Sequence, residues 1–179
     1  MEYSELESLV SKYQAEQRID EVVWFYDHCK RLDPKVIVEI GIKEGGNLKV
    51  LSTLLPPDGI AVGIDPRKEI PWKMDDAMCT VHHIPKNSHL LGTAKALKKI
   101  LKNRKVDILF IDGDHSRDGM LQDFRDYSPF VRKGGIIAVH DIFYLKDVAE
   151  AWASIKGTKF ESSRNQSSIG IGFVYKEEE

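Results

Sequence analysis

The sequence predicts an α/β fold with a doubly wound, mostly parallel sheet and a C-terminal antiparallel hairpin. Short apolar runs rich in β-branched residues recur along the chain, and segments with helical periodicity separate them. Near-continuous apolar strands joined by helices indicate a parallel sheet covered on both faces, with right-handed crossovers. Ligands of such sheets bind beyond the carboxyl ends of the strands, so functional residues are expected there.

Five runs have the composition of buried parallel strands. They lie at residues 36–40, 60–64, 79–84, 107–111 and 135–139. The helical patterns NLKVLSTLL, SHLLGTAKALKKILKN and RDGMLQDFRDYSPFV lie between them. After a further helix, KDVAEAWASIKG, the chain continues with TKFESS and IGIGFVYK, separated by the polar loop RNQS. This ending is typical of an antiparallel hairpin.

The length of 179 residues is enough for one core and too short for two domains of typical size. Residues 1–33 are predicted to form N-terminal helices that act as a lid or an oligomer contact, which allows a homo-oligomer. Residues 34–176 form the predicted ligand-binding domain, and 177–179 an acidic tail. Cys29 and Cys79 have no metal-binding spacing and are interpreted as buried thiols.

The charge balance favours a small-molecule substrate. The 26 Lys and Arg against 28 Asp and Glu create no broad field to attract nucleic acid or an anionic membrane. The first residues, MEYSELESLV, lack the basic and apolar regions of a signal peptide, and no stretch is long enough to span a bilayer. These features predict a cytoplasmic protein.

The first two strand ends carry a pattern for adenosine binding. Gly41, Gly45 and Gly46 follow the first predicted strand, and Asp65 ends the second, where a carboxylate can accept hydrogen bonds from ribose hydroxyls. The alternative is a glycine-rich turn without a ligand. Lys43 stands where a dinucleotide pyrophosphate needs bare backbone, and the chain has no P-loop motif. S-adenosylmethionine carries no phosphate and therefore fits the pattern best.

The segments VEIGIKEGGN, VGIDP, VDILFIDGDHSRDGMLQDFRDYSPFVRKGGIIAVHDI and IGIGFVY resemble the class I S-adenosylmethionine-dependent methyltransferases, specifically the class-24 or cephalosporin-hydroxylase-like branch. The resemblance covers about residues 34–175 and implies a Rossmann-like, seven-stranded sheet. The binding roles that it implies are Glu39, Gly41 and Gly45 around the methionine part, Asp65 at the ribose, and Asn87 and Ser88 near the adenine. Lys43 departs from the usual pattern, and either pairs with the cofactor carboxylate or points into solvent.

A second group of polar residues follows the fourth and fifth strands. Asp112 and Asp141 are hard oxygen ligands suited to Mg²⁺, and His140 shifts the preference toward Mn²⁺. The resemblance implies a divalent metal that orients a substrate hydroxyl, and Asp112 is also counted among the cofactor-binding residues. Asp114 or His115 would take the hydroxyl proton, with a slight preference for Asp114. The alternative is that these acids cap turns and hold no ion.

Other polar and aromatic residues are assigned no chemistry. His82, His83 and His89 show no paired carboxylate, and Asp123 and Asp126 are expected on the solvated face of their helix. Trp72 and Met74 could cover the adenine or shape a substrate mouth, but loop residues of this type more often pack on a core.

The sequence thus favours a small-molecule methyltransferase acting on oxygen, with divalent-metal assistance as an option. A nicotinamide-dependent oxidoreductase fits Asp65 but is opposed by Lys43 and by the predicted hairpin. A non-catalytic module that binds the cofactor or a protein partner is the other alternative. Retention of both acid-and-histidine groups argues against it.

Overall fold

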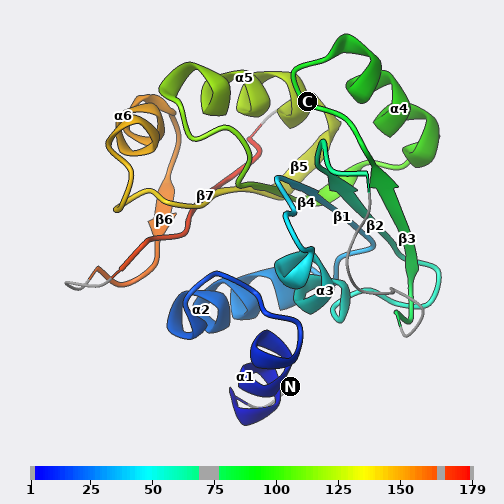
Figure 1. Ribbon diagram of the computed structural model, residues 1–179, viewed down its shortest axis with the longest axis horizontal. Coiled ribbons are helices and arrows are strands. Elements are labelled where there is room, and N and C mark those ends of the chain that lie inside the picture. Colours follow the sequence, from blue (N-terminus) through cyan, green and yellow to red (C-terminus); the bar gives the residue numbers. More distant parts are fainter. Residues whose placement is uncertain (1–2, 69–76, 165–167, 178–179) are drawn as a thin grey trace.

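The computed structural model describes residues 3–68, 77–164 and 168–177. A central sheet separates two layers of helices, with α1, α2 and α3 on one face and α4, α5 and α6 on the other (Figure 1). Trp72 and Met74 lie outside the described residues. No helix in the described part of the chain is long and apolar enough to cross a membrane.

The sheet has seven strands in the order β3-β2-β1-β4-β5-β7-β6. The strands are β1 Val36–Ile40, β2 Ile60–Ile64, β3 Thr80–Ile84, β4 Val106–Ile111, β5 Val131–Val139, β6 Lys159–Glu161 and β7 Gly172–Tyr175. The first five are parallel, and β7 pairs antiparallel with both β5 and β6. The predicted fold class, including the C-terminal hairpin, is confirmed.

The helices are α1 Tyr3–Lys12, α2 Ile19–Lys30, α3 Gly46–Ser52, α4 Leu91–Leu101, α5 Arg117–Tyr127 and α6 Lys146–Ser154, with a 3₁₀ turn at Ser128–Phe130. The N-terminal helices cover one face of the sheet. Phe25 of α2 packs against Phe110 of β4 and Phe173 of β7, with ring centroids 5.3 and 6.2 Å apart. The side chains of β1 and β4 are buried throughout, because both strands lie in the middle of the sheet between the two helical layers.

Strand β5 begins four residues earlier than its sequence predicts. β5 starts at Val131, whereas the apolar pattern starts at 135. Val131 pairs with Val106 before the register shifts, and regular pairing resumes at Ile136 opposite Ile108. Gly134 has a φ of +73° within this irregular stretch. The bulge interrupts the apolar alternation, so the first residues of the strand resemble a loop in sequence.

The strand order brings the functional loops together. β1 lies between β2 and β4, and the crossovers to β2 and β4 run on opposite faces of the sheet. A doubly wound sheet opens a crevice at such a reversal of strand order, outside the carboxyl ends of the strands. The segments after β1, β2, β3 and β4 meet there.

Candidate functional site

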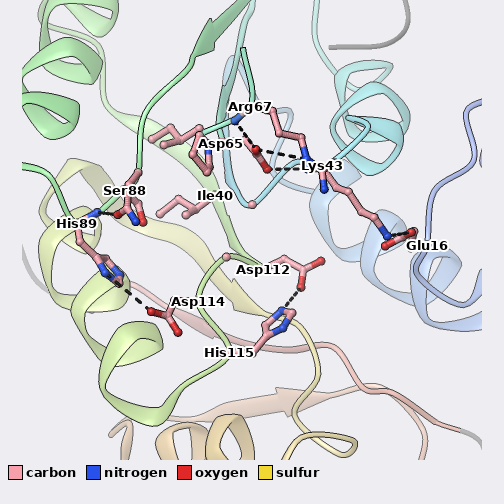
Figure 2. A pocket seen from close by; sticks show the side chains of 15 residues that line it. Glu16, Ile40, Lys43, Asp65, Arg67, Ser88, His89, Asp112, Asp114 and His115 are labelled. Carbon is pink, nitrogen blue, oxygen red and sulfur yellow. Dashed lines mark hydrogen bonds and ion pairs between the residues drawn. The ribbon is translucent and has the colours of Figure 1, made fainter. Parts of the chain in front are cut away.

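A cavity of about 570 Å³ lies at this edge of the sheet. The ends of β1, β2 and β4 and the loop after β3 line it, and Figure 2 shows their side chains converging on it. Of the residues predicted to bind the cofactor, the cavity wall contains Gly41, Lys43, Asp65, Asn87, Ser88 and Asp112. Glu39 lines a smaller adjoining cavity.

The glycine turn after β1 approaches β4 closely. Gly41 has a φ of +80°, and a Cβ atom there would lie 2.0 Å from the carbonyl oxygen of Asp112. Only glycine therefore fits this position without a shift of the backbone. Gly41 also lines the cavity, where its backbone can contact a bound molecule.

Asp65 is held by the turns on either side of it. Its Oδ2 accepts a hydrogen bond from the backbone N–H of Lys43 at 2.9 Å, and its Oδ1 accepts one from that of Arg67 at 2.9 Å. The Lys43 side chain reaches across the cavity rim to form an ion pair with Glu16 (Figure 2). The carboxylate of Asp65 is therefore fixed in orientation at the cavity wall.

Asn87 and Ser88 form the wall contributed by the loop after β3. Oδ1 of Asn87 accepts the backbone N–H of His89 at 2.8 Å, and the carbonyl of Ser88 accepts the hydroxyl of Tyr127 at 2.7 Å. These bonds attach the loop to itself and to α5. A rigid loop at this position can present backbone and side-chain polar groups to a ring system.

Acids and histidines from the ends of β4 and β5 form one cluster. His115 Nε2 lies 3.2 Å from both Asp112 Oδ1 and Asp141 Oδ2. His140 Nδ1 lies 3.2 Å from Asp112 Oδ1 and 3.7 Å from Asp141 Oδ1. One ligand atom each from Asp112, His115 and Asp141 lies within 4.8 Å of the others. His115 thus joins the two acids, a position for which sequence reasoning proposed His140.

The charges in this cluster balance one another. Burial raises the pKa of Asp112, but hydrogen bonds and charges from His115 and His140 outweigh burial and hold it below its ordinary value. The hydrogen bond to Asp112 raises the pKa of His115. Burial lowers the pKa of His140, but the hydrogen bond to Asp112 and the charges of Asp112 and Asp141 outweigh burial and hold that pKa above its ordinary value. Burial raises the pKa of Asp141.

Asp141 adopts a backbone conformation that is uncommon for residues other than glycine. Its φ is +63°, and its carbonyl accepts the N–H groups of Tyr144 and Leu145. Aspartate and asparagine tolerate this left-handed region better than most residues. The conformation turns the chain sharply after β5 and brings the carboxylate to His115.

Asp114 points away from this cluster. Its Oδ1 accepts the backbone N–H of Ser116 at 2.8 Å, and its Oδ2 lies 4.0 Å from His89 Nδ1 (Figure 2). The hydrogen bond from Ser116 lowers the pKa of Asp114. The geometry therefore favours His115 over Asp114 as the group closest to the clustered acids.

Two sequence-based assignments were wrong. Asp123 is fully buried, not solvated, and its Oδ1 lies 3.3 Å from His89 Nε2, without the alignment of a hydrogen bond. Burial raises the pKa of Asp123 to about 6. His89 therefore has a paired carboxylate. The signal was available in the spacing, because Asp123 shares a helical face with the buried residues Met120 and Tyr127.

Gln17 is a site residue that sequence reasoning missed. Its Nε2 donates a hydrogen bond of 2.8 Å to Asp112 Oδ2 across 95 residues of sequence. Gln17 lies in the connection between α1 and α2, where no periodicity or motif marks it.

A sequence profile described as a methyltransferase domain matches residues 38–142. The chain belongs to the class-24 methyltransferase-domain family, within the class I S-adenosylmethionine-dependent methyltransferases. The match runs from β1 to the turn after β5 and so includes both clusters of predicted site residues.

A curated relative is uncharacterized protein R132 of Acanthamoeba polyphaga mimivirus, 33% identical over 120 residues. The matched region covers 61% of this chain and 52% of the relative, so the chain spans about half the length of the relative that it matches.

Solved structures share the fold at low sequence identity. An O-methyltransferase from Bacillus cereus in complex with SAH (S-adenosylhomocysteine) aligns with a TM-score of 0.67 and 15% identity, over 97% of this chain and 91% of that chain. The O-methyltransferase TomG from Streptomyces achromogenes, in complex with SAM, aligns with a TM-score of 0.60 and 15% identity, over 96% of this chain and 87% of that chain. The methyltransferase MycE from the mycinamycin biosynthetic pathway, in complex with Mg and SAH, aligns with a TM-score of 0.66 and 16% identity, over 97% of this chain and 53% of that chain.

Proposed function

We propose that this methyltransferase methylates a hydroxyl oxygen of a small molecule, with a divalent cation held at the ends of β4 and β5. The observation that carries the proposal is that the predicted cofactor site and the cluster of acids and histidines share one cavity. Asp112 and His115 line the same cavity as Asp65 and Ser88, so an adenosine-containing cofactor and the cluster of acids would be neighbours. The O-methyltransferase names of the structural relatives support the choice of oxygen.

The proposed cofactor is S-adenosylmethionine. Asp65 would accept the ribose hydroxyls, Asn87 and Ser88 would border the adenine, and Glu39, Gly41 and Lys43 would surround the amino-acid part. Gly45 lines neither cavity, and its role would be to close the glycine turn through its N–H bond to the carbonyl of Ile42. The structural relatives named above were solved with SAM or SAH, which supports the choice of cofactor.

The acid-and-histidine cluster suits a divalent cation by its donor set. Two carboxylate oxygens and one imidazole nitrogen lie within 4.8 Å of one another, and such mixed sets bind Mg²⁺, Mn²⁺ and related ions. A cation bound there would lower the pKa of a coordinated hydroxyl and hold its oxygen in place. We assign the ligand roles to Asp112, His115 and Asp141. His140 would position Asp112 through their hydrogen bond.

The chain's own residues can also manage the proton. Methylation of a hydroxyl forms an oxygen–carbon bond, returns the electrons of the broken carbon–sulfur bond to sulfur, and releases the hydroxyl proton. His115 is half-exposed and lies against two carboxylates that would stabilise its protonated form. In a metal-independent reaction His115 would therefore be the base, which is the alternative that the following experiment separates.

The test is calorimetric titration with S-adenosylhomocysteine, with and without Mg²⁺ or Mn²⁺, and with NADH as the control ligand. We expect saturable binding of S-adenosylhomocysteine, no binding of NADH, and direct binding of Mn²⁺. Asp141→Asn keeps a residue that tolerates positive φ and should abolish Mn²⁺ binding. Asp126→Asn on α5 is the matched control.

The outcomes separate the parts of the proposal. Unchanged Mn²⁺ affinity in folded Asp141→Asn would remove the cation site and leave His115 as the base. Binding of NADH in place of S-adenosylhomocysteine would overturn the cofactor assignment and favour an oxidoreductase.

A further inference from the structure

Glu21 of α2 is a buried acid to which the proposed reaction assigns no role. Its side chain is 1% exposed. Its Oε1 accepts the backbone N–H groups of Ile169 and Gly170, each at 3.0 Å. Its Oε2 is buried and has no hydrogen-bond partner among the described residues. One oxygen of this carboxyl group therefore anchors the backbone before β7, and the other is available for a second contact.

His140 presents a complementary atom on the same face of the sheet. Side chains alternate along β5, so His140 follows Ile136 and Ala138 on the face that α2 covers. Its ring lies 6.2 Å from that of Phe110, against which α2 packs. Nδ1 of His140 lies 3.2 Å from Asp112, whereas its buried Nε2 has no hydrogen-bond partner in the described part of the chain. A partner for Nε2 must lie on the side of the ring away from Asp112.

The charges of Glu21 and His140 act on each other across the space between them. Burial raises the pKa of Glu21, whereas the N–H of Gly170 and the charge of His140 lower it. Burial lowers the pKa of His140, and Asp112, Asp141 and Glu21 outweigh burial and raise it. A carboxyl oxygen and an imidazole nitrogen can form a hydrogen bond whichever of them holds the proton. A side-chain rotation or one bridging water would therefore satisfy both buried atoms, which are costly to leave unpaired.

The other oxygen of Glu21 acts on the turn that follows Asp141. Residues 169–170, whose N–H groups bind Glu21, also offer their carbonyls to the turn. These carbonyls accept the backbone N–H groups of residues 142–143, at 3.3 and 2.9 Å. Asp141 is thus supported on both sides, because His140 precedes it and the anchored turn follows it.

We propose that Glu21 is a positioning residue of the acid-and-histidine cluster. Its Oε2 orients His140 and thereby Asp112, and its Oε1 anchors the turn after Asp141. This inference rests on the proposed function, in which the two aspartates bind the cation. It gives α2 a role in the reaction, although α2 lies outside the segment that the methyltransferase-domain profile matches.

The test is a double-mutant cycle measured by calorimetric titration with Mn²⁺ alone. Glu21→Leu should weaken Mn²⁺ binding by about tenfold, as expected for a residue that supports a metal ligand. His140→Asn keeps an N–H group for Asp112 but removes Nε2. In that background Glu21→Leu should weaken Mn²⁺ binding by no more than about threefold. An equal loss in both backgrounds would show that Glu21 acts only through the packing of α2, and would overturn the inference.

Ser162→Ala is the matched control. The hydroxyl of Ser162 accepts the backbone N–H of Ile171 at 3.1 Å, so this variant loosens the same segment before β7 without altering Glu21 or His140. It should lower the free energy of unfolding and leave the Mn²⁺ affinity within about threefold of wild type. A loss of Mn²⁺ affinity as large as that of Glu21→Leu would attribute the effect to the anchored segment alone and contradict the role of Oε2.

A second variant keeps the inference testable if Glu21→Leu does not fold. Glu21→Gln retains an oxygen for the two backbone N–H groups and replaces Oε2 with an amide nitrogen, which can only donate. The ¹⁵N resonance of His140 Nε2 should then shift, whereas the resonances of His28 on the same helix should not. An unchanged His140 resonance would overturn the inference and leave the proposed function standing. Failure of the wild-type protein to bind Mn²⁺ would instead overturn the cation site of the proposed function, and the His140 resonance would then decide the link to Glu21.

Discussion

Two groups of aspartate and histidine each contribute at least one residue to the wall of the main cavity, and their acids lie in different environments. The strand-end cluster, Asp112, His115, His140 and Asp141, follows two neighbouring parallel strands, and its imidazoles lie at 3.2 Å from the carboxylate oxygens. The buried pair, His89 and Asp123, joins the loop after β3 to the inner face of α5. Asp112 of the first group lines the cavity as an ionised acid. Asp123 of the second group is buried in the helical layer.

The environment of each acid explains the difference. At Asp112, hydrogen bonds from two histidines outweigh burial, so its pKa is lowered. At Asp123, burial outweighs the charge of His89, and its pKa is raised to about 6. The same residue type therefore lies in two different environments. These environments favour the proposed cation ligand at Asp112 and a structural acid at Asp123. Substitutions at the two acids should have opposite consequences.

The largest effect is expected from Asp112→Asn. Loss of the charge at the centre of the strand-end cluster should lower the rate of methyl transfer by at least about 100-fold. The proposed cation would lose a ligand, and the substrate hydroxyl would lose the cation that holds it. Single-turnover assays with the purified variant, together with circular dichroism to verify the fold, would measure this. Activity within a few-fold of wild type would show that the cluster is not the reaction centre.

Asp123→Asn should instead change stability. Because the folded chain holds the Asp123 proton more tightly than the unfolded chain, its contribution is fully present below about pH 4 and is lost as the pH rises through about 6. The variant should match the wild type at pH 4 and exceed its free energy of unfolding by up to about 3 kcal/mol at pH 8. Urea denaturation at both pH values would test this.

The cofactor affinity of Asp123→Asn should remain within about threefold of wild type, because no atom of Asp123 lines the cavity. A variant that is less stable at pH 8 than the wild type would show that the pair with His89 outweighs the cost of burial. The buried pair would then resemble the strand-end cluster, and the comparison would fail.

Asp65→Asn sharpens the comparison with a third acid, whose carboxylate is held by two backbone N–H groups. It should weaken S-adenosylhomocysteine by about tenfold to a hundredfold and leave Mn²⁺ binding unchanged, because only the ribose acceptor loses its charge. Calorimetry with each ligand separates the two effects. Wild-type affinity for S-adenosylhomocysteine would contradict the adenosine orientation.

The smallest effect is expected from Asp114→Asn, which lies between the two groups. Asparagine keeps an oxygen for the N–H of Ser116, and the carboxylate is exposed and 4.0 Å from His89. Methyl transfer should therefore stay within about threefold of wild type, and stability within about 0.5 kcal/mol. A loss of 100-fold or more at unchanged cofactor affinity would instead identify Asp114 as the base.

The sequence by itself determined the sheet and the edge at which the site lies. The strands β1 and β2 match their predicted limits, because buried parallel strands carry a continuous apolar pattern that is local in sequence. The positions of Asp65, Asp112 and Asp141 after strands were sufficient to place them at one edge, since parallel strands share the direction of their carboxyl ends.

Only the tertiary structure decided which side chains meet. The contact between Asp141 and His115 joins the turns after two different strands, with Asp141 in a left-handed conformation, and the burial of Asp123 depends on how α5 packs against the loop after β3. Gln17 reaches Asp112 because a connection without a motif lies on the glycine start of α3. Local patterns specify elements and their faces, whereas contacts between distant loops follow from packing, which no short stretch of sequence encodes.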